Sequence, residues 1–331
     1  MNGFVGLDIA AKTFEMVVRE GGQNARPVSF AQTAEGHAKA IKQLKALKPR
    51  HIVMEATGIY YLDLAVALAQ AGLPVSVINP KSFRHFAELK LAGSKTDGVD
   101  SALLAEFGER MTPPQWTPPD PTRLALRDIA RQINRLTASR TQARNRLHAL
   151  RAKRMTLPLL IEDELEGIAL LERRIERLQQ AALALLAESA ELTVQLKALC
   201  AAKGIATASA IAILGELCVL PAHLKAPQVS RYAGLDVRLC QSGTSVNRPA
   251  RLSKAGNAYL RAALYMPAMS AIRHDPRAKA FYAALVARGK KKIQALCAVM
   301  RKYLTGLWAC FKHSTPFDSA RLFSDCHLRH T

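Results

Sequence analysis

The sequence predicts an α/β domain at the N-terminus, then a helical coiled-coil arm and a mainly α C-terminal domain. Over residues 1–112, short β-branched runs alternate with helical patterns. The proline-rich segment TPPQWTPPDP follows, and two long helical patterns come after it. The last region opens with two helical runs around a glycine. We therefore expect domains at 1–112 and 201–331, with the arm at 113–200.

The first domain is expected to contain three strands followed by alternating helices and strands. The expected order is strands FVGLDIA, TFEMVVRE and PVSFAQ, a helix over 34–47, strand HIVMEA, a helix from about 60 to 71, strand VSVIN, and helices from about 80 and 98. Three hairpin-joined strands followed by this alternation is the order of an RNase H-like sheet. In such a sheet the first strand is central and the fourth lies beside it.

Acidic residues mark three of these elements. Asp8 and Glu55 each sit at the end of an expected strand, and Asp97 and Asp100 are spaced to share one face of a helix. Clustered carboxylates repel each other unless a cation neutralises them, and oxygen ligands suit Mg²⁺ or Mn²⁺. The sequence therefore predicts a metal site that acts on a phosphodiester.

The overall charge points to a polyanionic partner. The net charge is +21 and the pI is about 10.1, which favours nucleic acid over a membrane. No run of about 18 apolar residues could span a bilayer, and no secretory signal is visible, so we expect a cytoplasmic, nucleoid-associated protein. The six cysteines form no C-x-x-C pair, which argues against a zinc site or a disulfide framework.

Arginines recur every four residues at the start of the arm. Residues 113–159 hold ten basic and two acidic residues, and only Asp128 opposes the repeat. Such a stripe is typical of a helix that contacts a phosphate backbone, although a solvated surface helix is the alternative. The repeat comprises Arg123, Arg127, Arg131 and Arg135.

A heptad-like pattern follows Pro158. Apolar residues step alternately by three and four from Ile168 to Leu199, with weaker positions at Ala182 and Ser189. This spacing predicts a coiled-coil seam. The two long helices would form an antiparallel hairpin, and the seam could pair either within the chain or with a second subunit.

A serine-rich polar loop lies in the last region. The loop covers residues 241–247, and cations follow it at Arg248, Arg251, Lys254 and Arg261. Cations of this kind can bind a scissile phosphate and stabilise the charge that develops on it. Most surface serines have no such role, so the loop alone does not identify a nucleophile.

Taken together, these motifs resemble a known family. GLDIA, EATG and KTDGVD, joined in one chain to QSGTSV and RLSKAGNAYLRAALYMPAM, resemble the DEDD-type insertion-sequence transposases of the IS110 family. The resemblance spans residues 4 to about 320. It implies a RuvC-like (RNase H-like) N-terminal domain, a coiled-coil arm and a C-terminal transposase domain with a catalytic serine.

The resemblance also implies roles for individual residues. Asp8, Glu55, Asp97 and Asp100 would bind Mg²⁺, and Ser242 would join covalently to DNA, with Ser245 as its nearest competitor. A bridge RNA would direct the recombination of donor and target DNA. The assembly would be a homo-oligomer, from dimer to tetramer, in which the RuvC-like domain of one subunit meets the serine domain of another. Cys240 and Gln241 have no assigned role.

Two other functions fit part of the sequence. A metal-dependent nuclease or resolvase would direct water at the phosphate through the carboxylates alone, leaving Ser242 structural. A non-catalytic nucleic-acid scaffold would need only the arginine stripe, but four convergent carboxylates weaken phosphate binding unless they hold a metal.

Overall fold

The computed structural model describes residues 3–56, 58–90, 97–242 and 246–323. For Asp97, Cys240, Ser242 and residues 246–249, it describes the backbone alone. The chain forms two compact units, Met1–Pro118 and Pro119–Thr331. The division into three domains, with the arm as a domain of its own, stays a prediction.

The first unit is built on one mixed sheet. Its strands are β1 (Phe4–Ile9), β2 (Thr13–Glu20), β3 (Gln23–Asn24), β4 (Val28–Ala31), β5 (His51–Glu55) and β6 (Val75–Ile78). They are ordered β3-β2-β1-β5-β6, and β4 also pairs with β2. β1 is antiparallel to β2 and parallel to β5. The expected central position of β1, with β5 beside it, is confirmed; the short β3 was not expected.

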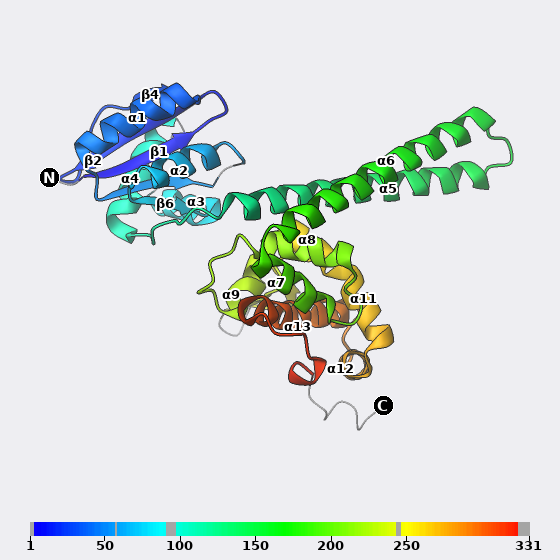
Figure 1. Ribbon diagram of the computed structural model, residues 1–331. Coiled ribbons are helices and arrows are strands. Elements are labelled where there is room, and N and C mark those ends of the chain that lie inside the picture. The colour runs from blue at the N-terminus through cyan, green and yellow to red at the C-terminus, as the bar shows by residue number, and fades with distance from the viewer. Residues whose placement is uncertain (1–2, 57, 91–96, 243–245, 324–331) are drawn as a thin grey trace. The chain divides into compact units, whose positions relative to one another are not determined.

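Helices cover both faces of this sheet, as Figure 1 shows. They are α1 (Ala34–Leu47), α2 (Tyr61–Gln70), α3 (Pro80–Leu89) and α4 (Asp97–Met111). Leu7 and Met54 are buried in one core with residues of α1 and α2, whereas Val53 is buried in the other with residues of α3 and α4. Alternate residues of β1 and β5 therefore face opposite helical layers.

The helix α4 lies directly against β1 because Gly6 has no side chain. A Cβ atom at Gly6 would stand only 2.5 Å from the backbone nitrogen of Ala105 and 2.9 Å from the Cβ of Leu104. Farther along α4, a Cβ at Gly108 would stand 2.8 Å from Val53 Cγ2. The helix thus runs from the carboxyl end of β1 back toward its start, at a separation that larger residues would prevent.

The proline-rich segment after α4 lies along β6. The backbone N–H of Trp116 donates to the carbonyl of Val75 at 2.7 Å, and the hydroxyl of Ser76 donates to the carbonyl of Pro114 at 2.9 Å. The Trp116 side chain packs on the α1–α2 core. The segment therefore belongs to the first unit as a packed element.

The second unit begins with two long helices, α5 (Pro121–Ala152) and α6 (Pro158–Ala187), which lie side by side as a hairpin (Figure 1). Asp120 caps α5 by accepting a hydrogen bond from the N–H of Thr122 at 2.8 Å. Ala143, Leu147 and Ile168 form a small core between the two helices. The helical hairpin is as expected, and its coiled-coil character stays a prediction.

The sequence predicts one continuous helix for the heptad pattern from Ile168 to Leu199, but the structure divides this stretch between two helices. The helix α6 ends at Ala187, and the side chain of Ser189 caps α7 (Ala190–Cys200) by accepting from the N–H of Leu192 at 3.3 Å. Leu192 and Leu199 are buried in the core of the second unit. Ser189, a weak position of the seam, is therefore where the chain changes helix.

The rest of the second unit is mainly helical. It contains α8 (Thr207–Leu217), α9 (Ala226–Tyr232), α10 (Ala258–Ala263), α11 (Tyr265–His274), α12 (Pro276–Ala287), α13 (Lys292–His313) and the 3₁₀ turn η1 (Ser319–Arg321). The fully buried Tyr303, Leu304 and Leu307 place α13 in the core of the unit. Among the described residues, no helix is both long and apolar enough to cross a membrane.

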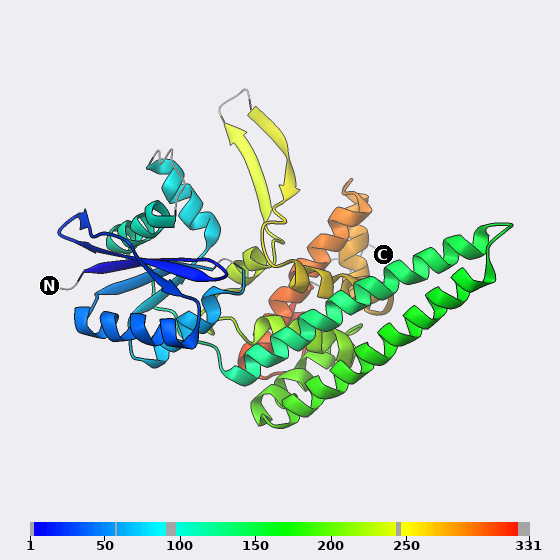
Figure 2. The ribbon, with the colours of Figure 1, turned by 90° about the horizontal axis from the view of Figure 1, so that it is seen from above.

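A two-stranded hairpin projects from these helices (Figure 2). It consists of β7 (Val237–Ser242) and β8 (Val246–Leu252). The segment expected to be a polar loop, residues 241–247, is therefore strand at both ends, and its middle lies outside the described residues.

Candidate functional site

Asp8 and Glu55 lie at the carboxyl ends of neighbouring parallel strands. Leu7 of β1 and Met54 of β5 lie opposite each other in the parallel pair, and Asp8 and Glu55 are the residues that follow them. Because side chains alternate along a strand, Asp8 lies on the face of Gly6 and Glu55 on the face of Val53, which is the face covered by α4. Both carboxyl residues are half-buried.

The helix α4 brings Asp97 and Asp100 to the same edge of the sheet. Ser101 and Ala105 lie against Gly6, so the helical turn before Ser101 lies farther along β1, at the level of Asp8. Asp97 begins α4, and Asp100 is half-buried within it. The i, i+3 spacing on a helix, predicted from the sequence, is confirmed for these two residues.

Glu15 is a further carboxylate that sequence reasoning missed. It is the register partner of Asp8 across β1 and β2, and directly opposite residues share a face of the sheet. Its Oε2 lies 3.5 Å from where a Cβ at Gly98 would stand, at the first turn of α4. The hairpin register between the first two expected strands was the signal that could have found it.

The cations near α4 form ion pairs with glutamates in the second half of this helix. Arg19 donates to Glu109 at 2.7 Å, and Glu106 accepts from Lys90 at 2.8 Å and Arg110 at 2.7 Å. Burial by itself would raise the pKa of Glu106, but the hydrogen bonds from the two cations lower it below its ordinary value. These ion pairs stabilise the second half of α4.

The carboxylate set fits a hard divalent cation by its chemistry. Its donors are all oxygens, and they come from three elements that meet at one edge of the sheet. Among the side chains that the structure describes, no group of three or more His, Cys, Asp or Glu residues is arranged to hold a metal ion, and the side chain of Asp97 lies outside that set. The candidate ligands are therefore Asp8, Glu55, Asp97 and Asp100, with Glu15 adjacent.

The serine lies in the second unit, at the last residue of β7. Ser242 pairs in register with Val246, and Arg248 pairs with Cys240. Ser245 lies outside the described residues. Nothing in the described part of the chain assigns a role to Cys240 or Gln241.

Backbone hydrogen bonds between two segments, residues 232–236 and 252–257, hold the root of the hairpin. The N–H of Lys254 donates to the carbonyl of Gly234 at 3.0 Å, and the N–H of Asn257 donates to the carbonyl of Tyr232 at 2.6 Å. Gly234 has φ +66°, and a Cβ there would stand 2.8 Å from Arg261 Nη1. Residues 233–235 and 251–257 therefore build the base from which β7 and β8 project.

The cations after the serine differ in what they contact. Arg251 and Lys254 are exposed. Arg261 is half-buried and donates to the carbonyl of Ala233 at 2.8 Å, so one of its nitrogens already holds the hairpin root. The side chain of Arg248 is outside the described set.

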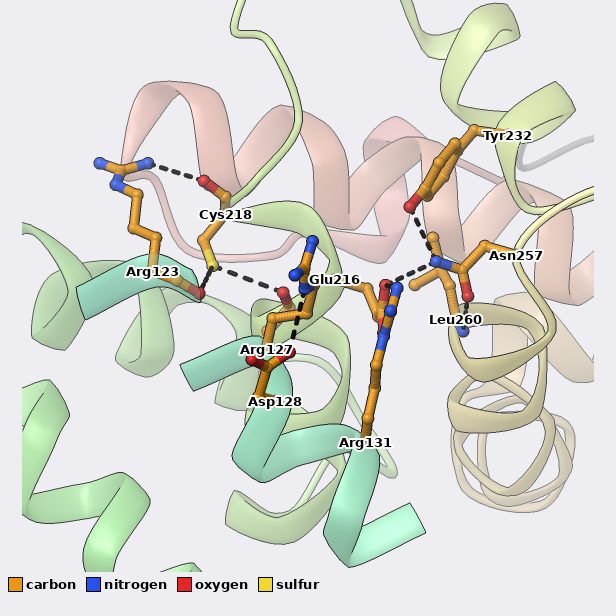
Figure 3. A network of polar contacts seen from close by, with 10 residues as sticks. Arg123, Arg127, Asp128, Arg131, Glu216, Cys218, Tyr232, Asn257 and Leu260 are labelled. Carbon is orange, nitrogen blue, oxygen red and sulfur yellow. Dashed lines mark hydrogen bonds and ion pairs between the residues drawn. The ribbon is translucent and has the colours of Figure 1, made fainter. Parts of the chain in front are cut away.

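A buried polar network joins this root to α5 (Figure 3). The carboxylate of Glu216, only 2% exposed, accepts from Arg131 Nε at 2.6 Å and Nη2 at 2.9 Å. Asn257 Nδ2 donates to the same carboxylate at 2.5 Å and approaches the hydroxyl of Tyr232 at 2.8 Å. The hydrogen bond to Glu216 raises the pKa of the Arg131 guanidinium, which keeps its charge.

The other arginines of the expected phosphate-binding stripe also have protein partners. Arg123 donates to Glu191 at 2.8 Å and to the carbonyl of Cys218 at 3.1 Å. Arg127 is largely buried and approaches Asp128 at 3.4 Å, whereas Arg135 is exposed and donates to Gln132.

The acids that oppose the stripe come mostly from other helices. The expectation that only Asp128 would oppose it was therefore incomplete. Farther along α5 the same holds, since Arg144 and Arg146 pair with Glu172 and Glu164 of α6.

Comparison with protein families identifies the chain. One family model, described as Transposase, matches residues 5–151, and a second, described as Transposase IS116/IS110/IS902 family, matches residues 196–283. The two models together cover both the carboxylate set and the serine hairpin. The protein is an IS110-family transposase. Membership in this family supports DNA transposase or recombinase activity in general.

Relatives of this IS110-family transposase match nearly its whole length. Pilin gene-inverting proteins of Moraxella lacunata and Moraxella bovis are each 27% identical over 326 residues, covering 95% of this chain and 97% of theirs. An uncharacterized 43.6 kDa protein of insertion element IS110 from Streptomyces coelicolor is 29% identical over 117 residues, covering 35% of this chain and 28% of its own.

Solved structures of RuvC match a smaller part of the transposase. Thermus thermophilus RuvC in complex with a Holliday junction substrate covers 35% of this chain and 99% of its own, with 15% identity and a TM-score of 0.29. A second Thermus thermophilus RuvC structure covers 32% of this chain and 94% of its own, with 17% identity and a TM-score of 0.26.

Proposed function

We propose that this transposase cuts and rejoins DNA through a covalent phosphoserine at Ser242, assisted by a divalent cation on Asp8, Glu55, Asp97 and Asp100. The observation that carries the proposal is the placement of Asp8 and Glu55 at adjacent strand ends, under the helix that begins with Asp97. A divalent cation at this edge of the sheet would offset the repulsion between carboxylates that the three elements bring there, and oxygen ligands suit such a cation.

The proposed step exchanges one phosphate ester bond for another, so the free energy of the phosphodiester bond is kept for rejoining. The Ser242 oxygen forms a bond to phosphorus while the bond from phosphorus to one deoxyribose oxygen breaks. The serine proton leaves to a base or to solvent, and the departing deoxyribose oxygen takes up a proton. Reversal with the hydroxyl of another DNA end rejoins the strand and frees the serine, so no net hydrolysis occurs.

Each group has a distinct task in this scheme. A divalent cation, Mg²⁺ or Mn²⁺, would neutralise phosphate charge and lower the pKa of a coordinated oxygen. Arg248 is the register partner of Cys240, which lies two residues before Ser242 on β7. Residues two apart on a strand, and residues directly opposite on paired strands, share a face of the sheet. We therefore expect Arg248 to lie on the face of Ser242 and to contact the scissile phosphate. Arg251 and Lys254 are exposed and would hold neighbouring phosphates.

We further propose that a bridge RNA selects the donor and target DNA, and that the working enzyme is a dimer or tetramer. The family resemblance supports both points, and the strongly basic second unit supports the binding of RNA. In such an assembly, the carboxylates of one subunit would act with the serine of another. RNA that copurifies with the protein, recovered and sequenced, tests the guide.

The central experiment traps the covalent intermediate. Labelled DNA that carries a nick beside the cleavage point should remain attached to the wild-type protein after denaturation. Ser242→Ala should lose the adduct completely, because the proposal assigns the bond to Ser242 and not to Ser245. Asp8→Asn should lose cleavage while keeping nucleic-acid binding. Gln241→Ala is the matched control on β7 and should retain the adduct.

Two outcomes of this experiment would contradict the proposal. An adduct that persists in Ser242→Ala would exclude that serine as the nucleophile. Free DNA ends without an adduct in the wild type would instead indicate a metal-dependent nuclease that uses water. Mixing the two inactive variants, Ser242→Ala and Asp8→Asn, tests the composite site, since activity should return if the sites are shared between subunits.

A further inference from the structure

A pocket of about 560 Å³ lies within the second unit, at the root of the β7–β8 hairpin. Val237 of β7 and Leu252 of β8 form one wall, and the first turns of α13, with Ile293 and Ala298, form another. Its volume falls within the range of about 300–1,000 Å³ that is usual for small-molecule sites. None of the residues discussed above as metal ligands or nucleophile lines it.

The chemistry of its lining is asymmetric. Aliphatic side chains make most of the walls, and all the charged lining residues are cations: Arg251, Lys254, Lys290 and Arg301. Among the described residues, no acidic side chain forms an ion pair with any of these four. A ligand that fits would be apolar on one part and anionic on another.

The backbone at one of these cations is held in an unfavourable conformation. Lys254 has φ +49°, in the left-handed region that residues other than glycine seldom adopt. Its N–H is fixed to Gly234, and the hydroxyl of the neighbouring Ser253 donates to Asp236. Such strain persists where surrounding contacts over-determine it and is concentrated at binding sites.

We propose that this pocket binds one unpaired nucleotide of DNA. The base would lie against Leu252, Leu285 and Ala298, and the adjoining phosphates would contact the four cations. A nucleotide is the unit of nucleic acid that combines an apolar face with a nearby anion, and pockets for flipped-out bases use apolar as well as aromatic side chains. The choice of DNA over RNA rests on the proposed function, because the pocket is built from the strands that carry Ser242.

A native thiol in the pocket reports on its occupancy. Cys297 lines the pocket and is half-buried, whereas Cys200, also half-buried, lies outside it. Burial raises the pKa of the Cys297 thiol above its ordinary value, although Lys254 and Arg261 act in the opposite direction. Alkylation is therefore carried out at mildly alkaline pH and measured for each cysteine-containing peptide by mass spectrometry. The readout needs no strand cleavage, so failure of the proposed reaction and failure of this proposal are distinguishable.

The probe is a short oligodeoxythymidine, compared with an abasic deoxyribose-phosphate chain of equal length and charge. At about ten times the dissociation constant, the oligodeoxythymidine should slow alkylation of Cys297 roughly tenfold, because the occupied fraction is protected. The abasic chain should not protect Cys297, and neither chain should affect Cys200. Equal protection by both chains, or protection by neither, would overturn the proposal. Stronger protection by oligouridine would exclude DNA as the ligand.

Two variants distinguish the contribution of the base to binding from that of the phosphates. Ala298→Phe fills the apolar wall without changing charge and should abolish the protection by oligodeoxythymidine. Arg301→Gln should weaken the binding roughly tenfold, because one charged contact is lost. Lys312→Gln removes the same charge from the exposed far end of α13 and should leave binding within twofold. Circular dichroism checks that each variant is folded, and an equal loss in Arg301→Gln and Lys312→Gln would contradict the assignment.

Discussion

Replacing Arg131 with methionine tests the buried network at the hairpin root. Methionine keeps much of the arginine stem but removes the guanidinium that donates twice to Glu216. The Glu216 carboxylate is 2% exposed, and from the described residues it would retain only the hydrogen bond of Asn257. Removing one partner of a buried ion pair leaves an uncompensated charge, which is more costly than the loss of an exposed pair.

The expected cost follows from this burial. Breaking a buried pair by removing one partner destabilises a protein by about 3–5 kcal/mol. The contact of Arg131 with the Tyr259 ring, 5.0 Å from its centroid, adds to the loss. For a unit of this size, each kcal/mol shifts Tm by about 2–4 °C, so we expect a fall of about 6–20 °C.

Thermal unfolding followed by far-UV circular dichroism measures this change. The matched control is Arg146→Met, which removes an arginine that also makes two hydrogen bonds to a glutamate, Glu164, but at the exposed side of the arm. Its Tm should barely change, since exposed pairs contribute little. A double variant, Arg131→Met with Glu216→Met, should recover most of the loss because no buried charge remains. Equal shifts in Arg131→Met and Arg146→Met would refute the reasoning.

Two further predictions concern the first unit and its contacts. Gly6→Ala should destabilise it by about 1–3 kcal/mol and impair DNA cleavage, because the new Cβ displaces α4 and its aspartates; denaturant unfolding and the adduct assay measure both effects. Gly167→Ala, in the interior of α6 with open space around it, is the control and should stabilise by about 0.5–1 kcal/mol. Burial lowers the pKa of His37 below 6.5, although Asp63 acts in the opposite direction. The neutral ring therefore contributes to stability above about pH 6.5, and this contribution is lost as the pH falls through the lowered pKa. Denaturant titrations at about pH 7.5 and 5.5 should show that slope in the wild type and a smaller one in His37→Gln; an unchanged slope would contradict it.

The first unit could be predicted closely from the sequence because its local patterns agree with its fold. The runs around Val5, Ile52 and Val75 are apolar and β-branched, and they become buried strands in the expected order. The helix expected from about residue 98 likewise begins at Asp97. The proximity of Glu15 to Asp8 could not be read directly, because it depends on strand register.

The hairpin β7–β8 was not anticipated for a physical reason. Its strands, VRLCQS and VNRPARL, alternate apolar and polar residues over only three positions each, and Val237 and Leu239 are exposed. The pairing is instead anchored at the root by Gly234 and the loop around Lys254. Long-range backbone contacts of this kind leave little trace in local sequence.

The partners of the arginine stripe were hidden for a related reason. The acids that pair with Arg123 and Arg131 are 68 and 85 residues away along the chain. Helical periodicity shows that the arginines share a face but not what that face packs against. Arg131 therefore looked like a surface cation although it pairs with the buried Glu216.

The segment around Trp116 has a consequence for solubility. In the first unit's sheet, β6 is the last strand of the order, and such strands offer unpaired backbone groups to other chains. Trp116 occupies one of these groups, and the nearby Pro113, Pro114 and Pro118 have no N–H with which to extend the ladder. The prolines thus protect the sheet against edge-to-edge aggregation. A fragment that ended before Trp116 would lose this protection and should precipitate more readily than one that ended at Pro118.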